Sequence, residues 1–195
     1  MERAVFLDRD GTIIKDVGYL DDGSNIRVLP RVIEAIKLLN QNGFKVIVVT
    51  NQSGIARGYF TEEDVREINY KLKELLACEG AILDGIYYCP HHVNGIVEEY
   101  RTTCYCRKPN PGMLEAAAGE FNLDLKSSFV IGDNLADIEA GHNARCTAIL
   151  LRDKYSWHGK NGTKIKPDYI ARDLYGAVKQ VVLGNLASKD DKGRE

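Results

Sequence analysis

The sequence predicts an α/β protein in which a central parallel sheet is covered by helices on both faces, making three layers. Short apolar runs alternate with amphipathic helical patterns, and this alternation is typical of strands joined by helical crossovers. The runs are apolar throughout, as in Val46-Ile47-Val48-Val49, which indicates strands buried on both faces. No internal repeat and no Pro/Gly/Ser-rich linker divides the 195 residues. We therefore expect one domain over residues 1–186 and a disordered, charge-rich tail over residues 187–195.

The apolar runs account for five strands and one shorter extended segment. Each run is short and rich in Val, Ile, Leu, Phe or Tyr, which favours a strand over a helix. The first run, Ala4 to Leu7, follows the N-terminus at once. The expected strands cover residues 3–8, 45–50, 84–89, 129–131 and 147–151, with the shorter segment around residues 169–170.

The helices are predicted from apolar residues at helical spacing and from their terminal residues. Pro30 suits the first turn of the first helix, and Gly43 follows its end. Thr61 is expected to cap the second, long helix. The buried stripe of that helix is predicted to consist of Ile68, Leu72, Leu75 and Leu76. The other expected helices cover residues 111–121, 135–142 and 174–186.

Composition and charge restrict the possible partners. The chain is 44% apolar and 28% charged with a formal net charge of -2, which offers no electrostatic basis for binding nucleic acid or an anionic membrane. No apolar run approaches the length of a membrane span. Because the first strand begins so close to Met1, we expect no signal peptide and a cytoplasmic protein.

Two aspartates follow the first strand directly, in the run Asp8-Arg9-Asp10-Gly11-Thr12. In an open α/β sheet, ligands bind at the carboxyl ends of the strands, which is where Asp8 and Asp10 are expected. Side chains two positions apart on extended backbone point the same way, so these carboxylates repel each other unless a cation or a proton intervenes. The arrangement suits a metal-assisted reaction in which one carboxylate attacks and the other moves a proton.

The ends of other strands add polar groups at the same edge. After the second strand, Thr50, Asn51, Gln52, Ser53 and Gly54 offer a hydroxyl and backbone N–H groups that suit a phosphate oxygen. After the fourth strand comes a third carboxylate, Asp133, and this number of hard oxygen ligands suits Mg²⁺.

Two cations and a fourth carboxylate complete the candidate site. Lys108 can neutralise a phosphate and stabilise the charge of the nucleophile, although a solvated surface lysine is the alternative. Arg107 can hold a phosphate or hydroxyl groups with its forked donors. Asp137 either favours the N-terminus of the helix that begins near it, or orients Lys108 or a metal-bound water.

Four soft metal ligands fall in two close pairs, Cys89-Pro90-His91 and Cys104-Tyr105-Cys106. Three thiolates and an imidazole suit structural Zn²⁺ in tetrahedral geometry, with no position left open for chemistry. An odd total of five cysteines in a reducing compartment argues against a disulfide framework. The loop between the pairs, residues 93–103, has little means of ordering itself, so a metal at its base would position Arg107 and Lys108. From the residues alone, His92 can replace His91.

In these motifs the chain resembles the haloacid dehalogenase superfamily of phosphohydrolases. The resemblance rests on Asp8-Arg9-Asp10-Gly11-Thr12, Thr50, Lys108, and Gly132-Asp133 with Asp137. It implies a Rossmann-like fold and a reaction in which Asp8 attacks phosphorus to form an aspartyl-phosphate. It further implies that Asp10 is the general acid and then the general base. Mg²⁺ would be held by the Asp8 carboxylate, the Asp10 backbone carbonyl and Asp133, while Thr50 and Lys108 hold phosphoryl oxygens.

The cysteine pairs are similar to those of one branch of this superfamily, which contains heptose bisphosphate phosphatases and histidinol-phosphate phosphatases. This similarity favours His91 as the zinc ligand. The long loop and the run Arg107-Lys108-Pro109-Asn110-Pro111-Gly112-Met113 resemble the heptose enzymes more closely. The resemblance implies removal of the C7 phosphate of D-glycero-D-manno-heptose 1,7-bisphosphate, giving heptose 1-phosphate for nucleotide-activated heptose and lipopolysaccharide.

Substrate binding is expected to involve several residues near the strand ends. Because the substrate carries a second phosphate, Arg57 and Arg107 are candidates for binding it. Only the zinc loop (residues 89–106) and residues 12–25 can cover the site, so the cap is minimal and a monomer is expected. The expected substrate-binding residues are Asn51, Gln52, Ser53, Arg57 and Arg107.

Other readings remain open from the sequence. The chain can be a phosphatase for histidinol phosphate or for another sugar bisphosphate. It can also be a non-enzymatic, receiver-like domain that takes phosphate on an aspartate, or a metal-binding interaction module. The set Asp8, Asp10, Lys108 and Asp133 argues against the two non-enzymatic readings.

Overall fold

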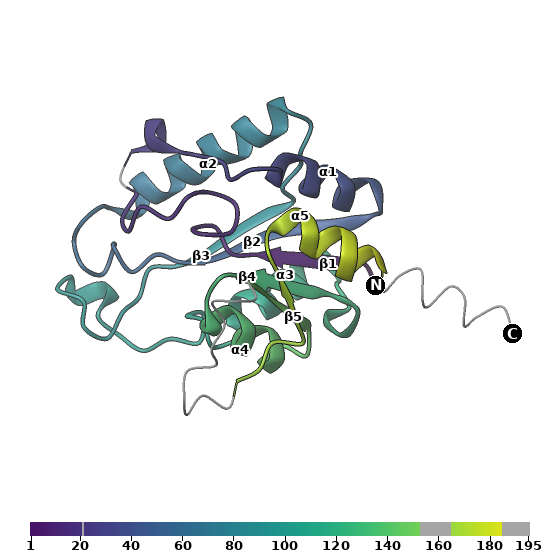
Figure 1. The fold of residues 1–195 in the computed structure, drawn as a ribbon. Helices are drawn as coiled ribbons and strands as arrows, with labels where there is room; N and C mark the ends of the chain where they lie inside the picture. Colours follow the sequence, from purple (N-terminus) through teal and green to yellow (C-terminus); the bar gives the residue numbers. More distant parts are fainter. Residues whose placement is uncertain (21, 153–164, 185–195) are drawn as a thin grey trace, which may run out of the picture.

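The fold is built on a six-stranded sheet in which all neighbouring strands are parallel (Figure 1). A computed structural model describes residues 1–20, 22–152 and 165–184. The strand order is β3-β2-β1-β4-β5-β6, so the order reverses at β1. The strands are β1 (Arg3–Leu7), β2 (Phe44–Asn51), β3 (Gly85–Cys89), β4 (Phe129–Gly132), β5 (Thr147–Leu151) and β6 (Tyr169–Ala171).

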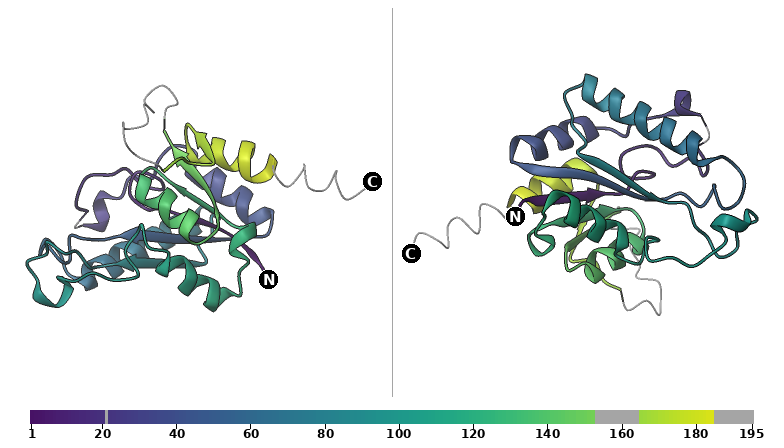
Figure 2. Two further views of the ribbon diagram at one scale, coloured as in Figure 1. Left: turned by 90° about the horizontal axis from the view of Figure 1, so that it is seen from below. Right: turned by 180° about the vertical axis from the view of Figure 1, so that it is seen from behind.

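Helices cover both faces of the sheet (Figures 1 and 2). The alternation of β1 sends Val5 and Leu7 into the core beneath α1, α2 and α5, and sends Ala4 and Phe6 into the core beneath α3 and α4. The helices are α1 (Val32–Gln41), α2 (Glu62–Cys78), α3 (Gly112–Phe121), α4 (Leu135–Asn143) and α5 (Leu174–Gly176), the last continued by a π-helical segment (Ala177–Val182). The predicted three-layer α/β class is therefore confirmed.

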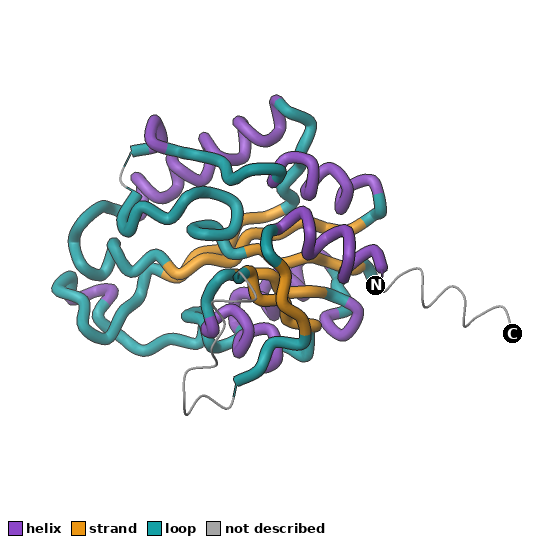
Figure 3. Tube along the Cα trace, in the orientation of Figure 1, coloured by secondary structure: helices purple, strands orange, loops and turns teal. Residues whose placement is uncertain are grey.

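The parallel arrangement gathers long loops at one edge of the sheet, which is the left-hand edge in Figure 3. Leu7 of β1 is in register with Val48 of β2 and with Ile131 of β4, so these three strands end close together. Because β1 lies where the strand order reverses, the loops on its two sides separate and leave room for a ligand.

Most predicted element boundaries agree with the structure to within two residues. The first helix begins at Val32 rather than Pro30, because Arg31 has a left-handed backbone conformation with φ of 62°. Thr61 caps α2 as predicted, in a reciprocal capping box with Asp64. The last predicted helix extends past the described residues at 185–186, and the predicted tail at 187–195 also lies outside them.

The predicted buried stripe of α2 is wrong at one position. Ile68, Leu72 and Leu76 are buried, whereas Leu75 is 39% exposed. Leu75 lies at the margin of the apolar arc, and on the opposite margin Asn69 is buried although it is polar. Within the described residues, no helix combines the length and the apolar character that crossing a membrane requires.

We expect Leu72→Ala to lower the free energy of unfolding by about 2–4 kcal/mol, because the truncation leaves a cavity in the core. Leu75→Ala is the matched control and should change it by less than about 1 kcal/mol. Urea denaturation of the full chain measures both values. Equal losses in the two variants would contradict the stripe described above.

Candidate active site

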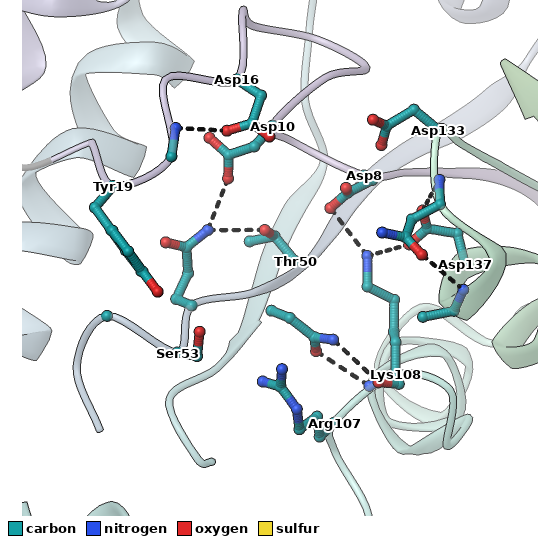
Figure 4. A pocket seen from close by; sticks show the side chains of 16 residues that line it. Asp8, Asp10, Asp16, Tyr19, Thr50, Ser53, Arg107, Lys108, Asp133 and Asp137 are labelled. Carbon is teal, nitrogen blue, oxygen red and sulfur yellow. Dashed lines mark hydrogen bonds and ion pairs between the residues drawn. The ribbon is translucent and has the colours of Figure 1, made fainter. Parts of the chain in front are cut away.

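A cleft of about 310 Å³ opens at the carboxyl edge of the sheet (Figure 4). It is formed by the ends of β1, β2 and β4, the segment after β1, and the residues that follow the cysteine cluster. Its polar lining includes Asp8, Asp10, Asp16, Tyr19, Thr50, Asn51, Gln52, Ser53, Arg107, Lys108, Asp133 and Asp137. The structure therefore brings together the predicted residues from four separate segments.

The Lys108 ammonium group lies at the centre of the carboxylates. Its Nζ is 2.9 Å from Asp8 Oδ1 and 2.5 Å from Asp137 Oδ1, and it donates a hydrogen bond to the Val49 carbonyl. Lys108 is buried, so it is not the solvated surface lysine of the alternative reading. Burial alone would lower the pKa of Lys108, but the Asp137 and Asp8 carboxylates outweigh this effect and raise it, so the group stays charged.

Two neighbouring residues position the Lys108 backbone. The Asn51 side chain accepts a hydrogen bond from the Lys108 N–H at 3.1 Å and donates one to the Lys108 carbonyl at 3.0 Å. Arg107 donates from its NH1 to the His91 carbonyl at 3.0 Å, which ties this segment to the cysteine cluster. Asn51 lines the cleft and also fixes the Lys108 backbone. The second role could not be inferred from its position after a strand.

Asp137 has two roles, and both alternatives left open by the sequence occur together. One oxygen contacts Lys108, and the other accepts a hydrogen bond from the Asn134 N–H at 3.0 Å. The second bond belongs to a capping box at the start of α4, in which Asn134 is the N-cap residue. The helix terminus therefore fixes the carboxylate that orients Lys108.

Negative charge is in excess among these residues. Burial raises the pKa of Asp8 to about 6, with Asp137 and Asp10 adding to the effect and Lys108 opposing it. Burial, together with the charge of Asp8, also raises the pKa of Asp133 to about 6. Among the described residues, carboxylate oxygens of Asp8, Asp133 and Asp137 lie within 4.8 Å of one another. Such a cluster can hold a divalent cation, which would offset the repulsion.

Two glycines allow this close approach of carboxylates. A Cβ atom at Gly11 would lie 2.4 Å from Asp133 Oδ2, and one at Gly132 would lie within 3 Å of the Asp137 carboxylate. Gly11 also has φ of +82°, a conformation that other residues rarely adopt. Any larger residue at either position would displace a carboxylate from the cleft.

The Asp10 carboxylate is turned toward β2. It accepts a hydrogen bond at 2.9 Å from Gln52 Nε2, which also donates to Thr50 Oγ1 at 2.9 Å (Figure 4). Arg9 binds the same carboxylate, with NH2 3.0 Å from Oδ2. Within the described residues, the backbone hydrogen bonds around Asp10 end on the Arg9 and Ile14 carbonyls, which leaves the Asp10 carbonyl open to a cation.

The cysteine cluster forms at the base of the loop, as the sequence predicts. The three sulfur atoms of Cys89, Cys104 and Cys106 lie 3.2–3.4 Å apart, and His91 Nδ1 is 3.5 Å from Cys106 Sγ. Disulfide-bonded sulfurs would be about 2.05 Å apart, so these distances suit four ligands around one ion. The pKa values of Cys89 and Cys106 are raised by burial, so metal binding must displace protons from the thiols.

The neighbouring histidine, His92, faces away from the cysteine cluster, which favours His91 as the fourth ligand. His92 Nε2 is 3.3 Å from Arg57 NH2, and burial together with Arg107 and Arg57 lowers the pKa of His92. Arg57 lies outside the cleft lining, in contrast to Arg107. Its predicted contact with substrate therefore stays a prediction.

The loop over residues 93–103 makes backbone hydrogen bonds that the sequence did not indicate. The N–H groups of Ile96 and Val97 both donate to the Ala56 carbonyl, and residues Glu98–Tyr100 form a 3-10 turn. The loop is therefore joined to the segment after β2 as well as to the cysteine cluster.

Four site residues were missed by sequence reasoning. Asp16 and Tyr19 line the cleft, and the Tyr19 ring meets the Tyr59 ring at 4.5 Å in an edge-on contact. Arg9 is 1% exposed and donates to Asn69 of α2 at 2.9 Å. The signal for Asn69 was present, since it is an amide on the apolar side of an amphipathic helix.

Comparison with known proteins agrees with this geometry. A profile of the HAD-hydrolase-like family matches residues 105–177. A Yersinia pestis protein named D-glycero-beta-D-manno-heptose-1,7-bisphosphate 7-phosphatase is 47% identical over 150 residues, covering 76% of this chain and 80% of the relative. A Chlorobaculum tepidum protein named D-glycero-D-manno-heptose-1,7-bisphosphate 7-phosphatase is 40% identical over 195 residues, covering 96% and 98%.

The chain belongs to the haloacid dehalogenase-like phosphatases, in the heptose-bisphosphate phosphatase family. It is an enzyme, as the sequence predicts, which excludes the receiver-like and interaction-module readings. A solved structure described as D,D-heptose 1.7-bisphosphate phosphatase from B. bronchiseptica, complexed with magnesium and phosphate, superposes with a TM-score of 0.79 at 30% identity. That superposition covers 93% of this chain and 99% of the other.

Asp133→Asn should stabilise the phosphatase at pH 8 in buffer without magnesium. The raised pKa of Asp133 means that its protonated form favours folding below about pH 4, and that this contribution is lost as the pH rises through 6. The amide removes the buried charge, so we expect a gain of about 1–2 kcal/mol at pH 8 that fades near pH 4. Urea denaturation at the two pH values measures this.

Asp64→Asn is the matched control. Hydrogen bonds from Thr61 lower the pKa of Asp64, so its charged form favours folding and the variant should lose stability at pH 8. A loss of stability in Asp133→Asn at pH 8 would contradict the excess of negative charge in the cleft.

Proposed function

We propose that this phosphatase removes the C7 phosphate of D-glycero-D-manno-heptose 1,7-bisphosphate and releases heptose 1-phosphate. The observation that carries the proposal is the buried Lys108 ammonium group between Asp8 and Asp137, in a cleft of about 310 Å³. The names of the Yersinia pestis and Chlorobaculum tepidum relatives support this substrate over histidinol phosphate. The product would supply nucleotide-activated heptose for cell-surface glycans such as lipopolysaccharide.

In the proposed reaction Asp8 is the nucleophile. A carboxylate oxygen of Asp8 attacks phosphorus, and the bond from phosphorus to the sugar oxygen breaks as Asp10 gives that oxygen a proton. Water then attacks the phosphorus of the aspartyl-phosphate while Asp10 takes a proton from it. The bond between phosphorus and the Asp8 oxygen breaks, which releases inorganic phosphate and restores both carboxyl groups. Lys108 and Thr50 hold the phosphoryl oxygens throughout, since this chemistry depends on positioning and charge stabilisation.

Mg²⁺ is the proposed catalytic cation, and the residues present fit it. The Asp8 carboxylate, the Asp10 backbone carbonyl and Asp133 would hold it, and these are hard oxygen ligands. When bound, it offsets the repulsion between an anionic nucleophile and an anionic phosphate. The magnesium and phosphate in the B. bronchiseptica structure support this proposal.

Zn²⁺ is the proposed structural metal at the cysteine cluster. Cys89, His91, Cys104 and Cys106 supply three sulfurs and one nitrogen, which match the usual ligands of a closed zinc site. With four protein ligands no position remains for substrate, so the ion would act by holding the loop and Arg107 in place.

The sugar end of the substrate would lie against the outer part of the cleft. Ser53 and Arg107 line it, and Arg107 is the candidate for binding the second phosphate. Asn51 and Gln52 also line it, but their amides are bonded to Lys108 and Asp10, so their proposed contribution to substrate binding is indirect. That Arg57 contacts substrate, and that the enzyme is a cytoplasmic monomer, stay predictions.

Phosphate release with Mg²⁺ tests the proposal directly. We expect kcat/KM for the heptose bisphosphate to exceed that for histidinol phosphate by at least about 100-fold, which corresponds to differential transition-state binding of about 3 kcal/mol. One phosphate should be released per molecule, and Asp8→Asn should abolish release while circular dichroism stays unchanged. Preference for histidinol phosphate would overturn the substrate, and full activity in Asp8→Asn would overturn the nucleophile.

Cys104→Ser should reduce the zinc content, since a serine hydroxyl is a poor replacement for a thiolate ligand. Cys78→Ser is the matched control, because Cys78 ends α2 at an exposed position away from the cluster. Elemental analysis of the purified proteins should find close to one zinc per chain in the wild type and in Cys78→Ser, and markedly less in Cys104→Ser. Undiminished zinc in Cys104→Ser would place the metal elsewhere.

A further inference from the structure

The Asp10 carboxyl group is held by side chains of two other residues, Arg9 and Gln52. Arg9 Nε is 3.1 Å from Oδ2 and its NH2 is 3.3 Å from Oδ1, so the guanidinium contacts both carboxylate oxygens. Gln52 adds a third donor at 2.9 Å. The Asp10 side chain is still 24% exposed and lines the cleft, while Arg9 supports it from the buried side.

The groups that hold Asp10 are themselves fixed. Arg9 is buried, and its remaining NH1 donates to Asn69 Oδ1 at 2.9 Å. Asn69 is 6% exposed on the apolar side of α2, where an amide is costly unless it is hydrogen-bonded. Gln52 is 5% exposed, and its backbone N–H donates to the Cys89 carbonyl at 2.8 Å. Arg9, Gln52 and Asn69 together form the Asp10 support.

One amide connects the proposed acid to the phosphate-binding hydroxyl. Gln52 Nε2 donates both to Asp10 Oδ2 and to Thr50 Oγ1, so it sets the spacing between these two groups. The NH₂ group of Gln52 faces Asp10, so Oδ2 is the accepting oxygen and Oδ1 is the oxygen that can carry the proton. Gly11, which follows Asp10, has a positive φ and no side chain to restrain the turn, so the carboxyl group depends on these contacts for its direction.

We propose that the Asp10 support consists of positioning residues that direct the Asp10 carboxyl group at the leaving-group oxygen. This rests on the proposed role of Asp10 as general acid. A proton donor displaced by about 1 Å can cost on the order of 100-fold in rate. The support therefore matters most for substrates whose leaving group needs a proton, and little for substrates whose leaving group departs as a stable anion.

The test compares two leaving groups through kcat/KM, which reports the steps up to cleavage of the phosphate ester. A sugar alkoxide needs a proton from Asp10, whereas the 4-nitrophenolate of 4-nitrophenyl phosphate does not. We expect Gln52→Leu to lower kcat/KM about 10- to 100-fold for the heptose bisphosphate and less than about 3-fold for 4-nitrophenyl phosphate. Asn51→Ala is the matched control. It removes the hydrogen bonds that hold the Lys108 backbone, so it should lower kcat/KM by the same factor for both substrates.

Two variants of Asn69 test the Asp10 support at a residue that does not line the cleft. Asn69→Asp keeps an oxygen acceptor for Arg9 and should retain the wild-type ratio of the two kcat/KM values. Asn69→Leu removes the acceptor, suits the apolar stripe of α2, and should lower the ratio about 3- to 10-fold. This pair keeps the proposal testable if Gln52→Leu does not fold.

The outcomes separate the two levels of the proposal. Asp10→Asn should change the ratio at least as much as Gln52→Leu does. If Asp10→Asn leaves the ratio unchanged, the proposed role of Asp10 is overturned, and the support falls with it. Suppose instead that Asp10→Asn changes the ratio, while Gln52→Leu and Asn69→Leu lower kcat/KM by the same factor for both substrates. The acid role of Asp10 then stands and the Asp10 support is overturned.

Discussion

The buried ammonium group of Lys108 is the interaction on which the arrangement of the cleft depends. It contacts Asp8 at the end of β1, Asp137 at the start of α4 and the Val49 carbonyl of β2. A single cation thus connects three elements that are distant in sequence, and without it two carboxylates would face each other under burial. The capping box at Asn134 and the two hydrogen bonds between the Asn51 side chain and the Lys108 backbone hold this ion-pair network from both sides.

The cysteine cluster supports both halves of the cleft through its backbone. The His91 carbonyl accepts a hydrogen bond from Arg107, which precedes Lys108, the proposed phosphate-binding cation. The Cys89 carbonyl accepts a hydrogen bond from the backbone N–H of Gln52. The side chain of Gln52 in turn binds Asp10, the proposed proton donor. A metal bound to these ligands would therefore fix the cation and the proton donor relative to each other, although it lies outside the chemistry.

Sequence reasoning located the strands, the carboxylates and the cysteine cluster, because each depends on local pattern or on the common edge of a parallel sheet. It did not reveal which way side chains turn once they reach that edge. Asn51 and Gln52 were expected to meet substrate, yet their amides bind Lys108 and Asp10. Arg9 and Asn69 went unnoticed, because their pairing joins residues 60 positions apart and depends on how α2 packs on the sheet.

The distribution of charge in the cleft explains why a cation is expected there. Asp8 and Asp137 share Lys108, and Asp10 pairs with Arg9, whereas Asp133 forms no ion pair with a described residue although it lies beside Asp8 and Asp137. Burial raises the pKa values of both Asp133 and Asp8, which shows that negative charge is poorly compensated in this part of the cleft. A phosphate dianion would worsen this imbalance if it entered alone. A divalent cation held by Asp8 and Asp133, as proposed above, would offset both the repulsion among the carboxylates and the charge of an entering phosphate.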